Sequence, residues 1–216
     1  MKTSSTPLAW LALSLGTLLC SGCGSLLKPP PDPARYYLLQ APAAIAPARA
    51  EAVARPLALG LRRIELPPYL RSSAIVLRPG GTEVRYSEVG HWAEPLGQGI
   101  ARVLQETLAR SPAVASVAVY PAPYAEAPEY EISVRIVACE GVWEEGRWRA
   151  RFVARWEIRS TRDGSSGHPV AAEEYVAEAA EWAEGDFAAF TARIGAAVEA
   201  MGARWVEALQ AKGAHS

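Results

Sequence analysis

The sequence predicts an α+β fold, a two-layer sandwich in which two main helices pack on one face of a mixed or antiparallel β-sheet. Two segments have apolar residues at steps of three and four, one over residues 94–109 and one after Asp186. Residues 147–159 instead alternate between apolar and mostly polar side chains. Because the first pattern is typical of helices and the second of half-buried strands, we expect the order strands, helix, strands, helix.

The first part of the domain is predicted to contain four strands. Residues 35–39 form a short strand candidate, and an Ala/Pro-rich loop separates it from a second candidate at 57–66. The second strand ends before Pro67, because proline donates no hydrogen bond to a ladder. Residues 74–78 and 83–87 flank a Pro-Gly-Gly turn sequence and are predicted to pair as a hairpin.

The first helix is predicted over residues 94–109. Pro95 suits its first turn, where a missing N–H costs no helical hydrogen bond, and Ser111-Pro112 ends it. We expect one apolar stripe of this helix to face the core, namely Leu96, Ile100, Val103, Leu104 and Leu108.

The next strands are predicted at 114–120 and 130–142, followed by the most clearly patterned strand at 147–159 and, after a turn, a less distinct strand at 170–179. Alternation along 147–159 places one set of side chains on the core and the other toward water or a partner. The predicted core set is Trp148, Ala150, Phe152, Ala154, Trp156 and Ile158.

The last helix is predicted to begin at Asp186, a good N-cap residue that follows Gly185. Its apolar residues recur at helical spacing, and aromatic residues on such a stripe are core residues far more often than cofactor ligands. The stripe consists of Phe187, Phe190, Ile194, Val198, Met201, Trp205 and Leu209.

Size and charge limit the classes of function. The chain has 216 residues, 50% of them hydrophobic, and a formal net charge of -1. This composition suits one globular domain and excludes wholesale disorder. The balance of 22 basic and 23 acidic residues gives no support to a nucleic-acid binder, which normally has a basic excess.

Residues 1–22 are predicted to be a signal peptide. Lys2 is followed by an apolar run from Leu8 to Leu19, shorter than the ~20 residues that a transmembrane helix needs. The sequence Leu19-Cys20-Ser21-Gly22-Cys23 resembles a bacterial lipobox and predicts lipid attachment at Cys23. The alternative is ordinary signal-peptidase cleavage near Gly22, which would leave a soluble protein.

The predicted organisation has three further parts. Residues 23–34 are the lipidated cysteine and a Pro-rich tether, residues 35–211 are a single α+β domain, and residues 212–216 are a tail. After cleavage and lipidation, Cys139 is the one remaining free cysteine, so no intrachain disulfide is expected.

A search for catalytic, cofactor or metal sites finds no motif. His91, His168 and His215 lack the i, i+3 or i, i+4 spacing of helical metal ligands, and there is no CxxC, HExxH, GxSxG or phosphate-loop sequence. Cys139 lies in an apolar strand and is expected to be a small core residue. We therefore expect a protein that is not an enzyme, with no cofactor and no metal.

Two sets of residues are candidates for a partner interface. Arg147, Arg149 and Arg151 lie on the polar face of the alternating strand and form either a docking surface or a solvated face paired with Glu131 and Glu129. Separately, Trp92 either packs beside Leu96 at the start of the first helix or protrudes as an interface anchor, with His91 next to it.

Several short segments, in their order along the chain, resemble the ABC-type transport auxiliary lipoproteins, the PqiC/YmbA-like group. Besides the lipobox, they are Tyr36-Tyr37-Leu38-Leu39, Leu66-Pro67-Pro68-Tyr69-Leu70, Ser73-Ala74-Ile75-Val76-Leu77-Arg78 and His91-Trp92-Ala93-Glu94-Pro95-Leu96. The resemblance extends over nearly the whole predicted domain.

The resemblance implies a non-catalytic accessory role. Its members accompany an inner-membrane ABC permease and ATPase and an MCE-domain protein, in systems that move phospholipid or other hydrophobic molecules between the inner and outer membranes. It also implies anchoring at the periplasmic face of the outer membrane, favoured here by Gly24 after Cys23, and homo-oligomeric rings. Two alternatives stay open, an envelope scaffold unrelated to lipid transport and a periplasmic lipid-binding carrier.

Overall fold

The computed structural model describes residues 32–42, 56–120, 127–161 and 169–213. The described residues from Ala34 onward belong to one compact unit. The predicted signal peptide, residues 23–31 of the tether, His168 and the last three residues of the tail lie outside the described ranges.

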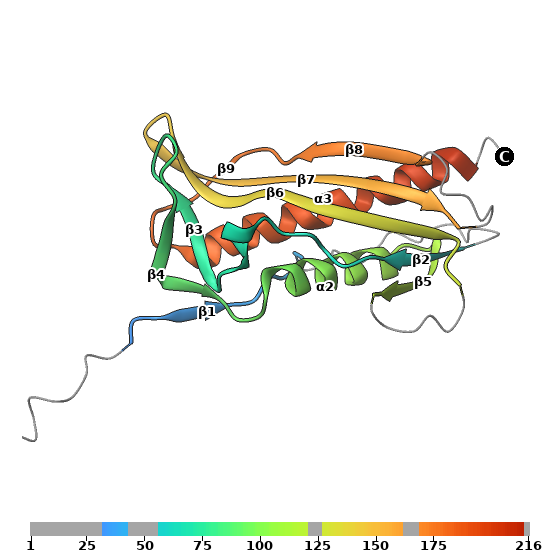
Figure 1. Cartoon of the computed structure of the whole chain (residues 1–216), viewed down its shortest axis with the longest axis horizontal. Coiled ribbons are helices and arrows are strands. Elements are labelled where there is room, and N and C mark those ends of the chain that lie inside the picture. Colours follow the sequence, from blue (N-terminus) through green and yellow to red (C-terminus); the bar gives the residue numbers. More distant parts are fainter. Residues whose placement is uncertain (1–31, 43–55, 121–126, 162–168, 214–216) are drawn as a thin grey trace, which may run out of the picture. The chain divides into compact units, whose positions relative to one another are not determined.

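The described residues form a nine-stranded mixed sheet and two long helices, which confirms the predicted α+β class (Figure 1). The strands are β1 (Arg35–Tyr37), β2 (Leu57–Leu61), β3 (Ala74–Arg78), β4 (Arg85–Trp92), β5 (Val114–Val119), β6 (Tyr130–Glu144), β7 (Arg147–Ser160), β8 (Ala171–Val176) and β9 (Ala180–Glu181). The helices are α2 (Leu96–Ala109) and α3 (Phe187–Gly213), with a short 3-10 turn, η1 (Pro68–Arg71).

Strand β6 is the centre of the sheet. One edge of β6 pairs with β7 along its whole length, antiparallel, and the other edge is shared by β2 and β3, both parallel to β6. Beyond β3 the order continues to β4 and then β1, and beyond β7 to β8 and β9. Strands β1 and β8 therefore lie at opposite edges of the sheet.

Both predicted apolar helix stripes are confirmed. Every predicted stripe residue of α2 and α3 is at most 5% exposed, from Leu96 to Leu209. Helix α3 runs along one face of β6 and β7 and contacts β7 and β1, while α2 contacts α3 and β5 (Figure 1). Asp186 is a side-chain cap as predicted, since its Oδ1 accepts a hydrogen bond of 3.0 Å from the N–H of Ala189.

Some strand limits differ from the prediction. The predicted hairpin forms between β3 and β4, but β4 continues to Trp92, where it pairs with β1. An irregularity in β4 makes this continuation hard to predict: the Ser87 hydroxyl accepts hydrogen bonds from the N–H groups of Val89 and Gly90, which interrupts the alternation. The predicted strand at 170–179 is shorter in the structure, where it forms β8, and a separate strand of two residues, β9, follows beyond the predicted range.

Candidate functional site

The β6–β7 hairpin contains the most clearly predicted strand. The two strands pair from Tyr130 opposite Ser160 to Glu144 opposite Arg147, and two residues join them. Glu145 and Gly146 both have positive φ, 52° and 79°, as a type I′ hairpin turn requires. All six residues predicted for the core face of β7 are at most 7% exposed, so the predicted alternation is confirmed.

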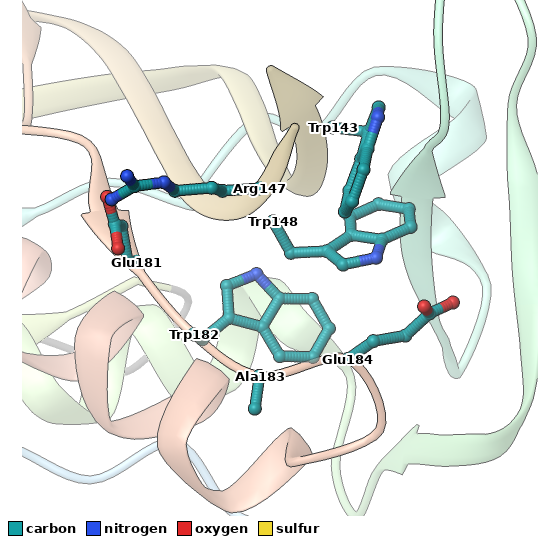
Figure 2. Close-up of a pocket in the computed structure, with 7 residues that line it drawn as sticks. All are labelled: Trp143, Arg147, Trp148, Glu181, Trp182, Ala183 and Glu184. Carbon is teal, nitrogen blue, oxygen red and sulfur yellow. The ribbon is translucent and has the colours of Figure 1, made fainter. Parts of the chain in front are cut away.

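An open pocket of about 520 Å³ lies at the turn end of this hairpin (Figure 2). It is lined by residues of the hairpin, of β9 and of the segment that precedes α3. These are Trp143, Arg147, Trp148, Glu181, Trp182, Ala183 and Glu184. Figure 2 shows the three indoles placed one after another, with the side chains of Arg147 and Glu181 meeting on one side and Glu184 on the other.

The three indoles of the pocket contact one another and differ in exposure. Trp143 and Trp148 have ring centroids 5.6 Å apart, and Trp148 and Trp182 have centroids 5.9 Å apart. Trp148 and Trp182 are each only 7% exposed, whereas Trp143 is 45% exposed. The aromatic contacts continue into the core, because the ring centroids of Trp182 and Phe190 are 5.2 Å apart. Trp143 is thus an exposed indole on a rigid, buried aromatic base.

The absence of a side chain at Gly141 allows Trp182 to lie against β6. A β-carbon at Gly141 would be 2.7 Å from the Trp182 ring and 2.9 Å from Leu77. The buried indole nitrogen of Trp182 has no hydrogen-bond partner among the described residues. A buried N–H without a partner costs free energy, so the packing of Trp182 against Gly141 leaves one polar group unsatisfied.

The predicted arginine face consists of Arg147, which lines this pocket, and of Arg149 and Arg151, which lie further along β7. Arg147 pairs with Glu181 at 2.7 Å and Arg149 with Glu145 at 2.9 Å. Arg151 is exposed and makes no ion pair or side-chain hydrogen bond within the described ranges. An ion pair as exposed as Arg147–Glu181 contributes only ~0–1 kcal/mol to the stability of the fold.

The carboxylates that pair with these arginines are not those expected from the sequence. They come from β9 and from the hairpin turn, whereas Glu131 lies 3.6 Å from Arg62. The sequence does not show which strands follow β7 in the sheet, and this neighbour relationship decides the pairing.

Trp92 and His91, the second candidate interface, lie in different environments, one in the core and one near the surface. Trp92 is 5% exposed and packs on Phe190, with ring centroids 6.2 Å apart, so its burial favours the packing interpretation over the interface anchor. His91 is half-buried on the outer face of β4, where its ring lies 5.5 Å from that of Tyr36. The structure therefore does not bring His91 and Trp92 to the arginine face.

Six of the seven pocket residues were not predicted as site residues. Trp143 lies at the end of the β6 alternation, and Trp148 was predicted only as a core residue of β7. The other four lie in the segment between β8 and α3, namely Glu181, Trp182, Ala183 and Glu184. The signal in the sequence is weak: seven tryptophans in 216 residues are many, but their spacing does not show which of them meet.

Comparison with known families decides the classification. The model of the ABC-type transport auxiliary lipoprotein component matches residues 37–207. The chain belongs to this family. The match confirms the resemblance found in the short segments, and it covers the hairpin, the pocket, all of α2 and most of α3. No curated protein sequence matches the chain significantly.

Solved structures show the same fold. Protein XCC0632 from Xanthomonas campestris, assigned to the family DUF330, is 17% identical, with a TM-score of 0.65 over 83% of this chain and 99% of that one. A second crystal structure, of an uncharacterised protein, is 13% identical, with a TM-score of 0.61 over 81% of this chain and 97% of that one.

Two kinds of reactive group can be assessed in the described residues, metal-ligand clusters and the thiol of Cys139. No group of three or more His, Cys, Asp or Glu residues within them is placed to hold a metal ion. Cys139 is buried, and its burial raises the pKa of its thiol far above the ordinary value, so the nucleophilic thiolate is suppressed. Among the described helices, none is both long and apolar enough to cross a membrane.

Proposed function

We propose that this family member is a non-catalytic accessory subunit of an MCE/ABC-type system that moves phospholipid or other hydrophobic molecules between the inner and outer membranes. A lipid on Cys23 holds it at the periplasmic face of the outer membrane, and residues 23–34 tether the domain. The family membership, the lipobox-like sequence and the lack of a catalytic motif support this role.

The docking surface in this proposal is the turn end of the β6–β7 hairpin. The observation that favours it is the exposed indole of Trp143 on its buried aromatic base, next to Arg147. Rigid aromatic residues and arginines are the side chains most enriched among energetically dominant interface residues. Arg149 and Arg151 do not line the pocket: they lie further along β7, on the face opposite to Trp148, and Arg151 is exposed.

Because of the lipid anchor, a weak contact with the partner protein is enough for binding. A protein confined to a membrane surface meets a partner in the same envelope at a raised effective concentration, so a small interface is enough. The surface places the exposed indole of Trp143 beside Arg147. We propose that it contacts the MCE-domain protein rather than the ATPase, because the ATPase lies across the inner membrane.

The test is affinity purification of the tagged full-length protein from its own envelope, with mass spectrometry of the co-purifying proteins. Recovery of an MCE protein with its permease and ATPase supports the transport role. Recovery of a different envelope complex instead contradicts it and favours the scaffold alternative. The apparent mass of the purified protein reports in the same experiment whether it forms a homo-oligomeric ring.

A pair of variants tests the surface itself. Trp143→Ala is expected to reduce partner recovery at least tenfold while the protein stays folded, because the side chain is 45% exposed. Tyr120→Ala is the matched control, since Tyr120 is a 55% exposed aromatic residue at the end of β5. Equal recovery with both variants would place the docking surface elsewhere.

A further inference from the structure

A small apolar patch lies on the outer face of β1 and β4, at the opposite edge of the sheet from β8. We call it the Tyr36 patch, and it consists of Tyr36, Leu38, Val89 and His91. Tyr36 is 64% exposed, Leu38 50% and Val89 36%, and the half-buried His91 ring lies against that of Tyr36.

The backbone directs these side chains away from the core. Tyr37 and Leu39 alternate with Tyr36 and Leu38, and they point inward: Tyr37 lies against Phe187, and Leu39 is only 1% exposed. On β4, a β-carbon at Gly90 would lie 2.6 Å from the Phe187 ring, so Gly90 also faces the core. The residues on either side of Gly90, Val89 and His91, therefore face outward beside β1.

The patch lies at the start of the domain. Tyr36 follows the last tether residue, Ala34, by two positions. The twelve residues from Cys23 to Ala34 span at most about 40 Å when fully extended. A lipid on Cys23 would therefore keep the Tyr36 patch within that distance of a bilayer.

The chemistry of the patch matches a membrane interface. Tyrosine is enriched at membrane–water interfaces, because its ring is apolar and its hydroxyl can contact water. Leucine and valine add apolar surface to the patch.

We propose that the Tyr36 patch contacts the bilayer that holds the Cys23 lipid and so orients the domain on it. This inference rests on the proposed lipid attachment. The patch is too small to bind a membrane by itself, but a second weak membrane signal next to a lipid anchor acts on a protein that is already concentrated there. In the order of the sheet, β4 and β3 lie between β1 and the β6–β7 hairpin, which we propose as the docking surface.

The experiment places a polarity-sensitive dye on the patch. The full-length lipidated protein, with Cys139→Ala as background, receives either Leu38→Cys or Val176→Cys and is labelled with the dye. Val176 is the matched control, because it is a 63% exposed aliphatic residue on β8 at the far edge of the sheet. Each protein is reconstituted in vesicles of phosphatidylethanolamine and phosphatidylglycerol, with or without brominated acyl chains.

Membrane contact predicts that the dye at position 38 shifts to shorter wavelength on vesicles and is quenched several-fold by brominated lipid, while the dye at 176 is unchanged. Equal, unshifted emission at both positions in protein that floats with the vesicles overturns the contact but leaves the lipid anchor intact. A shift at 38 that needs an added protein partner, or a second copy at raised protein density, also overturns it. Protein that carries no lipid and does not float overturns the anchor and, with it, this inference.

Discussion

Gly195 in the middle of α3 lies directly against the main-chain carbonyl of Gln40, in the segment that follows β1: a β-carbon at Gly195 would be 1.9 Å from that oxygen. The same segment is held from α2, where Arg102 donates a hydrogen bond of 2.6 Å to the carbonyl of Leu39 and also pairs with Glu94. The segment after β1 is thus fixed against both helices.

The variant Gly195→Ala is expected to destabilise the protein by about 1–3 kcal/mol, the usual cost of overpacking, since the clashing atom belongs to the backbone and cannot rotate away. Gly202→Ala is the control in the same helix, where the nearest atom is a Thr107 methyl carbon at 3.2 Å. Alanine improves helix propensity equally at both positions, so the difference in urea midpoint isolates the contact. Equal stability of the two variants would contradict the close approach.

Replacement of Trp92 separates its two interpretations. Because Trp92 is 5% exposed and packs on Phe190, Trp92→Ala is expected to cost about 3–5 kcal/mol of unfolding free energy. Trp92→Phe keeps an aromatic ring and should lose much less. Urea unfolding of both variants provides the measurement. If Trp92→Ala instead has wild-type stability but no longer binds its partner, Trp92 is an interface anchor.

The arginine face is best tested by neutralising it. Arg151 is the register partner of Glu140 across β6 and β7, and Glu140 is fully buried, so a glutamate at 151 would place two carboxylates side by side. The double variant Arg149→Gln/Arg151→Gln avoids this repulsion. We expect it to stay within about 1 kcal/mol of wild-type stability and to reduce partner recovery severalfold.

Arg155→Gln is the matched control for the arginine face, because Arg155 is on the same strand, is exposed and pairs with Glu174 beyond the pocket. Partner recovery that is unchanged by the double variant, or reduced equally by Arg155→Gln, would show that the solvated-face interpretation is right.

Alkaline pH is expected to destabilise the protein. Burial raises the pKa of the Cys139 thiol above its ordinary value of 9.0, and burial also raises the pKa values of Tyr69, next to the Glu140 carboxylate, and of Tyr175, above 10.0. The unfolded chain loses these protons at a lower pH than the folded protein, so stability is full below about pH 9 and falls as the pH rises above it.

Urea midpoints measured from about pH 8 to about pH 11 check this expectation, and Cys139→Ala should show a smaller loss over the same range. A thiol reagent should modify Cys139 only in the unfolded protein. Stability that is constant to pH 11, or rapid modification of the native protein, would contradict the burial of these groups.

Local patterns predicted much of the fold. The alternation along β7 and the apolar stripes of α2 and α3 are properties of consecutive residues, and each residue that they assigned to the core is buried. Hydrophobic burial acts on every such residue in the same way, so periodicity in the sequence is enough to find these elements. The segments that identify the family are local as well.

The candidate site could be predicted only in part. Arg147 was found because it belongs to the alternating strand, but its pairing with Glu181 depends on β9 lying beside β7. Trp182 was missed because its segment has no regular pattern, and because its place against Gly141 joins positions 41 residues apart in the chain.

Backbone periodicity and side-chain polarity are enough to predict which residues form the helices, the two long strands and their buried faces. They do not predict that β2 and β3 share one edge of β6, that Trp92 is buried, or that Trp143, Trp148 and Trp182 meet at one pocket. The reason is physical: strand order and aromatic contacts depend on which distant surfaces fit together at close packing, and no local pattern records that fit.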